Sequence, residues 1–289
     1  MKRVIFSMIG LFLIITGFIS CEKNETLQPI DTEIDYFDIA DKPKSKWNEL
    51  DYLSDSIYNA FGVKVIYEYT PRLIRNGNAF YYPPNYKNAL DYTRLMLAKF
   101  WLDPLKENFP KYYANETPRE YILMGGSYHH DPVSLTVGSG AGFNGQFYRL
   151  GMGSVNAFNR SNKDWLFDHL VILWHEHSHN QDVKYGRGVT FDNISVGTYY
   201  KEFWVQKSLA QANSDGFFRN YGGFAPEEDF ATTVEHITRF PENDVLKLIE
   251  TNTKLKSKYT YIMKFYADKG MNLHRLQALC DSVIFKTNY

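Results

Sequence analysis

Apolar residues recur at three- and four-residue steps over long parts of the chain, a spacing that places them on one face of an α-helix. The first such series consists of Trp47, Leu50, Leu53, Ile57 and Phe61. A longer series ends just before Pro110, and prolines commonly follow helix ends. On this pattern, helices are expected over residues 47–61, 86–108, 165–179, 200–218, 226–238, 242–251, 259–267 and 272–286.

Shorter apolar runs that lack this spacing predict β-strands at 63–69, 121–124 and 147–152. Between the last two runs lie Gly138, Gly140, Gly142 and Gly145. Their spacing is not that of a dinucleotide-binding loop and no amphipathic helix begins there, so a hairpin or mobile loop is expected. Strands followed by helices indicate an α+β fold, with a small mixed N-terminal sheet and a mainly helical C-terminal part.

The N-terminus has the layout of a secretory signal peptide. Two basic residues precede an almost wholly apolar run over 4–19, and the sequence turns polar after Cys21. The run is short for a bilayer span, and Gly10 and Gly17 interrupt it, which argues against a transmembrane anchor. Without residues 1–20 the chain has 30 basic and 33 acidic residues, a net charge of −3. This balance gives no indication of a nucleic-acid partner.

Residues 18–21, Phe-Ile-Ser-Cys, resemble a bacterial lipobox. The resemblance implies cleavage before Cys21 and lipid attachment to its sulfur and new N-terminus, and several acyl chains together give stable membrane attachment. We therefore expect a signal peptide at 1–20, a flexible polar tether at 21–40 and one folded domain at 41–289. The expected location is the bacterial cell envelope, with the protein anchored to the outer membrane and either periplasmic or surface-exposed.

Two histidines four residues apart, His175 and His179, project from one face of the expected helix and can share a cation. Zinc is the cation that this pattern indicates. Glu176 then has the place of the carboxylate that takes a proton from water and later delivers one to the leaving amine. The apolar residues of 166–174 give the motif the rigid, buried support that such chemistry needs.

A catalytic zinc usually has three protein ligands, so a third is required. No histidine follows His179 at the short metzincin spacing. Downstream, Pro226 begins an expected helix with Glu227, Glu228 and Asp229 in its first turn, and such a turn can present a carboxylate to the metal. The helix dipole favours acids at this place in any case, so the residues by themselves leave the choice open.

Three other residues with metal-binding or nucleophilic side chains are expected to be structural. His177 points about 200° around the helix from His175, because each residue advances the helix by about 100°, and His169 is also turned away. Cys280 belongs to an apolar helical stripe and is expected to be a buried, inert thiol. No second free thiol accompanies it beside a lipidated Cys21, so an intramolecular disulfide is excluded.

The segment 221–231, Tyr-Gly-Gly-Phe-Ala-Pro-Glu-Glu-Asp-Phe-Ala, resembles the second motif of lethal-factor-like gluzincins. By that resemblance Glu228 is the third zinc ligand, and Tyr221 stabilises the oxyanion of the tetrahedral intermediate. Members of that family often have a second acid four residues after the ligand, where this chain has Thr232. Glu235 or Asp229 can substitute for that acid.

The lipobox, the His-Glu-x-x-His motif and this helix together resemble zinc-metallohydrolase lipoproteins found beside TonB-dependent outer-membrane importers. The resemblance implies a zinc metallopeptidase that trims peptides or glycopeptides for nutrient uptake, with an importer complex as partner. The rival interpretation is an inactive, zinc-containing lipoprotein whose aromatic residues, 17% of the chain, bind a glycan or peptide. Intact Glu176 and Tyr221 favour the enzyme, and hydrolysis of a non-peptide amide stays open.

The N-terminal analysis predicts that Cys21 is lipidated and that the mature protein fractionates with membranes. Replacing Cys21 with Ala removes the atom that accepts the lipid, so processed Cys21→Ala protein should move to the soluble fraction on cell fractionation. Unchanged membrane attachment of Cys21→Ala would instead indicate a transmembrane anchor.

Overall fold

The computed structural model describes residues 42–68, 80–129, 137–138 and 147–286. The predicted signal peptide, the tether and Cys21 lie outside these residues, as does most of the glycine-rich segment before residue 147. In the described part of the chain, no helix combines the length and the apolar character needed to cross a bilayer.

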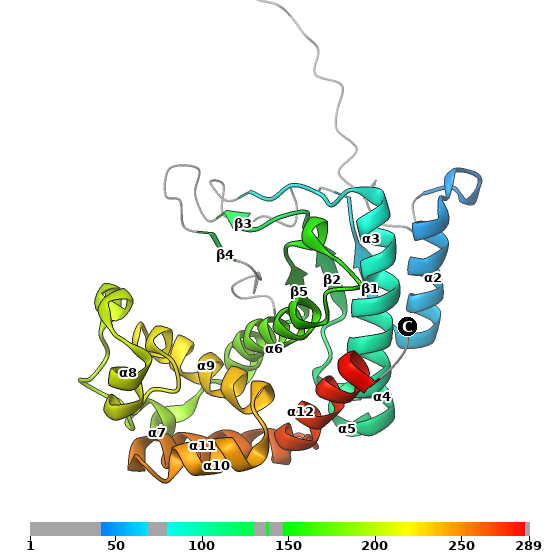
Figure 1. Cartoon of the computed structure of the whole chain (residues 1–289). Helices are drawn as coiled ribbons and strands as arrows, with labels where there is room; N and C mark the ends of the chain where they lie inside the picture. Colours follow the sequence, from blue (N-terminus) through cyan, green and yellow to red (C-terminus); the bar gives the residue numbers. More distant parts are fainter. Residues whose placement is uncertain (1–41, 69–79, 130–136, 139–146, 287–289) are drawn as a thin grey trace, which may run out of the picture. The chain divides into compact units, whose positions relative to one another are not determined.

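The described strands form two small sheets (Figure 1). The first has three parallel strands in the order β1-β2-β5, namely β1 (Lys64–Ile66), β2 (Glu120–Leu123) and β5 (Arg149–Met152). Tyr121 in β2 lies opposite Val65 on one side and Leu150 on the other. The second sheet is an antiparallel pair of β3 (Tyr128–His129) and β4 (Val137–Gly138). These sheets, with the helices before, between and after their strands, confirm the α+β class.

The N-terminal helices agree with the periodic pattern. After a short 3-10 turn, η1 (Lys44–Lys46), helix α2 spans Glu49–Phe61. It begins later than the apolar pattern because Asn48 caps it: the Asn48 side chain accepts a bond from the Asp51 amide, and Asp51 accepts one from the Asn48 amide. The expected helix at 86–108 is continuous, as α3 (Tyr86–Tyr92), a π-helical segment η3 (Thr93–Leu102) and α4 (Asp103–Asn108). Helix α5 (Pro110–Glu116) follows at once and was not predicted.

Helix α6 (Lys163–Tyr185) is 23 residues long and lies beside β5 (Figure 1). Its apolar half is fixed in the core through Trp174, whose ring packs against Trp101 with centroids 4.4 Å apart. The Trp101 indole in turn donates a hydrogen bond of 2.8 Å to the Tyr121 hydroxyl in the sheet. Trp174, which directly precedes His175, is thereby connected through Trp101 in η3 to Tyr121 in β2.

The rest of the described chain is helical, as expected. Its elements are α7 (Gly188–Asp192), η5 (Lys201–Gln206), α8 (Leu209–Asp215), η6 (Asn220–Gly223), α9 (Pro226–Arg239), α10 (Glu242–Ile249), α11 (Thr253–Asp268), α12 (Leu273–Asp281) and η7 (Ser282–Lys286). Helix α9 packs along α6, and α11 and α12 pack against α9 (Figure 1).

The prediction of a single helix over 200–218 is wrong. The chain instead forms the 3-10 helix η5 and then, separately, α8. The break is at Ser208, which caps α8: its hydroxyl accepts a 3.2 Å bond from the Gln211 amide, and the Gln211 side chain accepts a 2.9 Å bond from the Ser208 amide. These capping bonds start a new helix after Ser208, even though the apolar spacing continues on both sides of that residue.

Candidate metal centre

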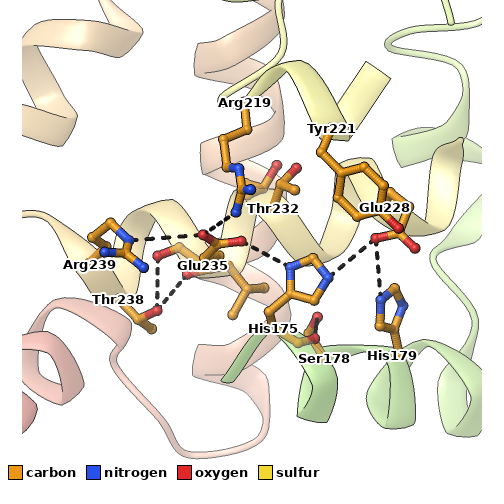
Figure 2. Close-up of polar contacts among 12 residues, drawn as sticks. His175, Ser178, His179, Arg219, Tyr221, Glu228, Thr232, Glu235, Thr238 and Arg239 are labelled. Atoms are coloured by element: carbon orange, nitrogen blue, oxygen red, sulfur yellow. Dashed lines mark hydrogen bonds and ion pairs between the residues drawn. The ribbon is translucent and has the colours of Figure 1, made fainter. Parts of the chain in front are cut away.

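His175 and His179 leave the same face of α6, with ring centroids 5.0 Å apart. Glu228 approaches both rings from α9 (Figure 2). Its Oε2 atom lies 3.2 Å from Nε2 of His175 and 3.5 Å from Nε2 of His179. One candidate ligand atom from each of the three residues lies within 4.8 Å of the other two. The structure therefore brings together the three residues predicted as metal ligands.

The start of α9 explains which of its three acids faces the histidines. Pro226 opens the helix, where a missing N–H is harmless, and acids in the first turn suit the helix dipole. Glu227 is exposed and Glu228 turns towards α6, whereas Asp229 is fully buried on another side. The two alternatives to Glu228 that the sequence left open thus point away from the imidazoles.

Asp229 forms a fully buried ion pair with Lys258 of α11, with Nζ 2.8 Å from Oδ1 and 2.7 Å from Oδ2. The ammonium also donates to the Gly216 carbonyl, and the Tyr199 hydroxyl donates to Asp229 at 3.1 Å. Burial raises the pKa of Asp229 to about 6 and lowers the pKa of Lys258, while each charge partly offsets the shift of the other. Since removing either partner would leave a buried charge unpaired, the pair fixes the first turn of α9, next to Glu228.

His175 is held from its other side by Glu235, two helical turns after Glu228 on α9 (Figure 2). The His175 Nδ1 atom lies 3.1 Å from Oε2 of Glu235, and Oε1 of Glu235 accepts a 2.6 Å bond from Arg219. A carboxylate at Nδ1 keeps the proton there and leaves the Nε2 lone pair directed at the centre. Thr232 does not take this place, because its hydroxyl donates to the Asp229 carbonyl at 3.3 Å.

The charges of the centre favour a cation between these groups. Burial lowers the pKa of His175, but its interactions with the carboxylates of Glu228 and Glu235, which accept from the ring nitrogens, and the charge of Glu176 raise it to about 10. Burial raises the pKa of Glu228, and the two histidines lower it more strongly, well below its usual range. The Glu228 Oε2 atom is buried and accepts no well-directed hydrogen bond within the described residues.

Two imidazole nitrogens and one carboxylate oxygen are a donor set found around catalytic zinc. The Glu235 carboxylate at Nδ1 of His175 and the buried, poorly satisfied Oε2 of Glu228 are both what a cation at this point requires. The residues present therefore fit a zinc ion, with His175, His179 and Glu228 as its ligands.

Glu176 and Tyr221, the two residues with predicted catalytic roles, lie at the same place. Glu176 is partly exposed, and its charge raises the pKa of both His175 and Tyr221. The Tyr221 ring stacks on His175, with centroids 6.3 Å apart, and lies beside Glu228 (Figure 2). Burial, together with the charge of Glu228 and a hydrogen bond to it, raises the pKa of Tyr221 well above its usual value.

The two excluded histidines of α6 belong to the core. His177 is fully buried, with its Nε2 2.9 Å from the Tyr112 hydroxyl, and burial lowers its pKa to about 3. His169 is bonded at 2.7 Å to the Tyr92 hydroxyl, and burial lowers its pKa to about 4. Both are neutral at pH 7 and pack away from the metal centre.

Sequence analysis did not predict that Tyr200 and Trp204 lie beside the site. The backbone amide of Tyr200 donates a 2.6 Å bond to the Gly223 carbonyl, and the Trp204 ring contacts the Tyr221 ring with centroids 4.8 Å apart. A Cβ on Gly223 would lie 2.2 Å from the Tyr200 ring, so this approach requires glycine. This contact was not predicted, because residues 200–218 were expected to form one helix.

One protein family and one solved structure resemble this chain. The model of a protein family described as "Putative zinc-binding metallo-peptidase" matches residues 43–271. A solved structure described in the same words, from Bacteroides caccae, aligns with a TM-score of 0.58 and 19% sequence identity over 84% of this chain and 95% of that chain, which shows a shared fold. No curated protein matches the sequence. Because the family model covers most of the chain and includes the whole candidate centre, the protein belongs to this family.

Proposed function

We propose that the protein is a zinc-dependent peptidase of the gluzincin type, with a His-Glu-x-x-His helix and a glutamate ligand from a second helix. The observation that carries the proposal is the approach of Glu228 Oε2 to the Nε2 atoms of His175 and His179, with Glu176 next to His175. Bound at this point, zinc would polarise a water molecule and the substrate carbonyl, and would lower the pKa of that water towards neutrality.

The protein's own groups supply the proton transfers. Glu176 directly follows His175 in α6 and is partly exposed, and its charge acts on both His175 and Tyr221. In the proposed reaction its carboxylate accepts a proton from the attacking water and later delivers a proton to the leaving nitrogen. Glu235 acts only through His175, because its carboxylate orients that ring.

Tyr221 is proposed to donate a hydrogen bond to the oxyanion that forms on the substrate carbonyl. Its raised pKa keeps the phenol protonated at neutral pH, and only a protonated phenol can donate. A hydrogen-bond donor that interacts with the oxyanion only in the transition state lowers the activation barrier without tightening the binding of the substrate.

The cellular role that we propose follows from the N-terminal sequence and from the resemblances described above. A lipid on Cys21 would hold the domain at the outer membrane, where it would cleave peptides or glycopeptides for nutrient uptake beside an importer. The lipobox-like residues 18–21 and the polar segment after them support the anchor.

Replacing Glu228 with Ala should lower zinc affinity by more than about 100-fold, because it removes one of three ligands. Glu227 is the matched control: it is the neighbouring residue in the same helical turn and is exposed, so Glu227→Ala should bind zinc as the wild type does. The measurement is zinc content after dialysis against graded chelator concentrations. Full retention of zinc by Glu228→Ala, or its loss in Glu227→Ala, contradicts the ligand assignment.

Glu176→Gln and Tyr221→Phe should both keep zinc and lose activity to different degrees. Glu176→Gln removes the proton acceptor and donor, so kcat should fall by about 10² to 10⁴-fold. Tyr221→Phe removes one hydroxyl that acts on the transition state, so kcat should fall by about 10² to 10³-fold with little change in KM. Both are measured on the best substrate from a peptide library.

Two results would count against these roles. A Tyr221→Phe variant with normal kcat would remove the tyrosine from the mechanism and weaken the alignment that also selects Glu228. Zinc-loaded wild-type protein that binds library peptides without cleaving any of them would favour the alternative of an inactive binding lipoprotein.

A further inference from the structure

Arg219 and Glu235 extend the metal centre on the Nδ1 side of His175, away from the Nε2 atom that faces the other candidate ligands (Figure 2). The two oxygens of the Glu235 carboxylate have separate partners: Oε2 lies 3.1 Å from Nδ1 of His175, and Oε1 accepts a 2.6 Å bond from the Arg219 guanidinium. The other arginine near Oε1 is Arg239, whose Nε lies 3.9 Å away, too far for a hydrogen bond. Within the described part of the chain, Arg219 is therefore the donor that holds Oε1.

The Glu235 carboxylate depends on protein donors because it is buried. Its side chain is only 4% exposed, so water has little access to the two oxygens. Burial raises the pKa of Glu235, but the contacts with His175 and Arg219 lower it more strongly, so the carboxylate is ionised at neutral pH. A buried charge that loses one of its partners is strongly destabilised. The carboxylate must therefore keep both contacts or move towards another donor.

The backbone that carries Arg219 is fixed on both sides. Phe218, before it, is fully buried, and the Asn220 side chain, after it, donates a 3.2 Å bond to the Lys207 carbonyl. The guanidinium thus reaches Glu235 from a fixed starting point. The Arg219 side chain is itself 47% exposed, so part of it stays in contact with water and its charge needs no second buried partner.

Removing Arg219 would change the attractions that act on Glu235. The Oε1 atom would lose its donor, and the nearest guanidinium among the described residues would then be that of Arg239. Arg239 and His175 lie on opposite sides of the Glu235 carboxylate (Figure 2). A turn of the carboxylate towards Arg239 would therefore draw Oε2 away from Nδ1 of His175.

We propose that Arg219 is a positioning residue of the metal centre: its guanidinium holds the Glu235 carboxylate against Nδ1 of His175 and so raises the affinity of the centre for zinc. The inference rests on the proposed zinc centre and adds a residue that acts on it without touching a ligand atom. A carboxylate at Nδ1 orients a histidine ligand, and loss of such support typically lowers metal affinity by about 10 to 100-fold.

Charge alone predicts the opposite effect. The Arg219 guanidinium and a zinc ion are both positive, so by Coulomb's law the removal of the guanidinium would strengthen zinc binding. The positioning role predicts that its removal weakens zinc binding, because Glu235 then supports the His175 ring less well. The direction of the change in zinc affinity therefore distinguishes a positioning residue from a nearby charge.

The test is the zinc dissociation constant of the mature protein, measured by competition with a chelator of known affinity. Arg219→Met keeps an aliphatic side chain and removes the guanidinium, so it should bind zinc about 10-fold more weakly than wild type. Arg239→Met is the matched control, because it removes the same charge near Glu235 but no hydrogen bond to it. Its zinc affinity should stay within about 2-fold of wild type. Unchanged or stronger zinc binding by Arg219→Met overturns the proposal.

A double variant tests whether Arg219 acts through Glu235. In Glu235→Ala protein the carboxylate is gone, so the addition of Arg219→Met should not weaken zinc binding further. Glu235→Gln, which keeps the size of the side chain, takes the place of Glu235→Ala if that variant does not fold. If Arg219→Met weakens zinc binding by the same factor in this background as in wild type, Arg219 does not act through Glu235 and the proposal is wrong.

A measurement without zinc keeps this result separate from failure of the proposed function. In zinc-free protein with isotopically labelled histidine, the Nδ1 proton of His175 is identified in the NMR spectrum by its loss in His175→Ala. This proton should exchange with water faster in Arg219→Met than in wild type, because its acceptor, Glu235, is held less firmly.

The two proposals can then fail separately. If wild type binds zinc but cleaves no peptide, the peptidase proposal fails and the zinc affinities still decide the role of Arg219. If wild type binds no zinc, the proposed function fails and the exchange rate alone decides whether Arg219 holds Glu235 at His175. If peptides are cleaved and Arg219→Met matches wild type in both zinc affinity and exchange rate, only the positioning role fails.

Discussion

The contact between helices α6 and α9 is the interaction on which the candidate site depends. Neither helix forms the site by itself, since α6 presents two imidazoles and α9 presents the carboxylates of Glu228 and Glu235 on one face. Bringing these groups together takes two negative charges out of water, which is unfavourable unless positive charge lies between them. The two carboxylates therefore raise the pKa of His175, so that its ring binds a proton and carries a positive charge. A bound zinc ion would supply positive charge beside Glu228 in place of that proton.

The rest of the fold holds these two helices in register. On the α6 side, Trp174 packs on Trp101, which is hydrogen-bonded to Tyr121 in the sheet. On the α9 side, the buried pair of Asp229 and Lys258 anchors the first turn to α11. A small error in either position would separate Glu228 from the imidazoles, so these buried contacts act on the site without touching it. The same anchoring holds η5 at the site, because the Trp204 ring contacts the Tyr221 ring.

The sequence predicted the features that local rules determine. The spacing of His175 and His179 places them on one helical face whatever the surrounding fold, and α9 begins at the expected proline. Local rules do not predict contacts between residues far apart in the sequence. The choice of Glu228 over Glu227 as the ligand therefore needed a family resemblance. The contact between His175 and Glu235 was not predictable either, because it joins residues 60 apart. The helix expected at 200–218 is interrupted by the Ser208 cap. The apolar spacing that predicted it does not indicate burial there, because Phe203 and Val205 are exposed.

The central claim, that this helix pair holds one zinc ion, is tested most directly by diffraction at the zinc absorption edge from crystals of the protein with one equivalent of zinc. The account predicts a single anomalous peak about 2.0 to 2.2 Å from the Nε2 atoms of His175 and His179 and from a carboxylate oxygen of Glu228. A peak held by other side chains, or zinc-treated crystals with no peak between these three residues, would contradict it.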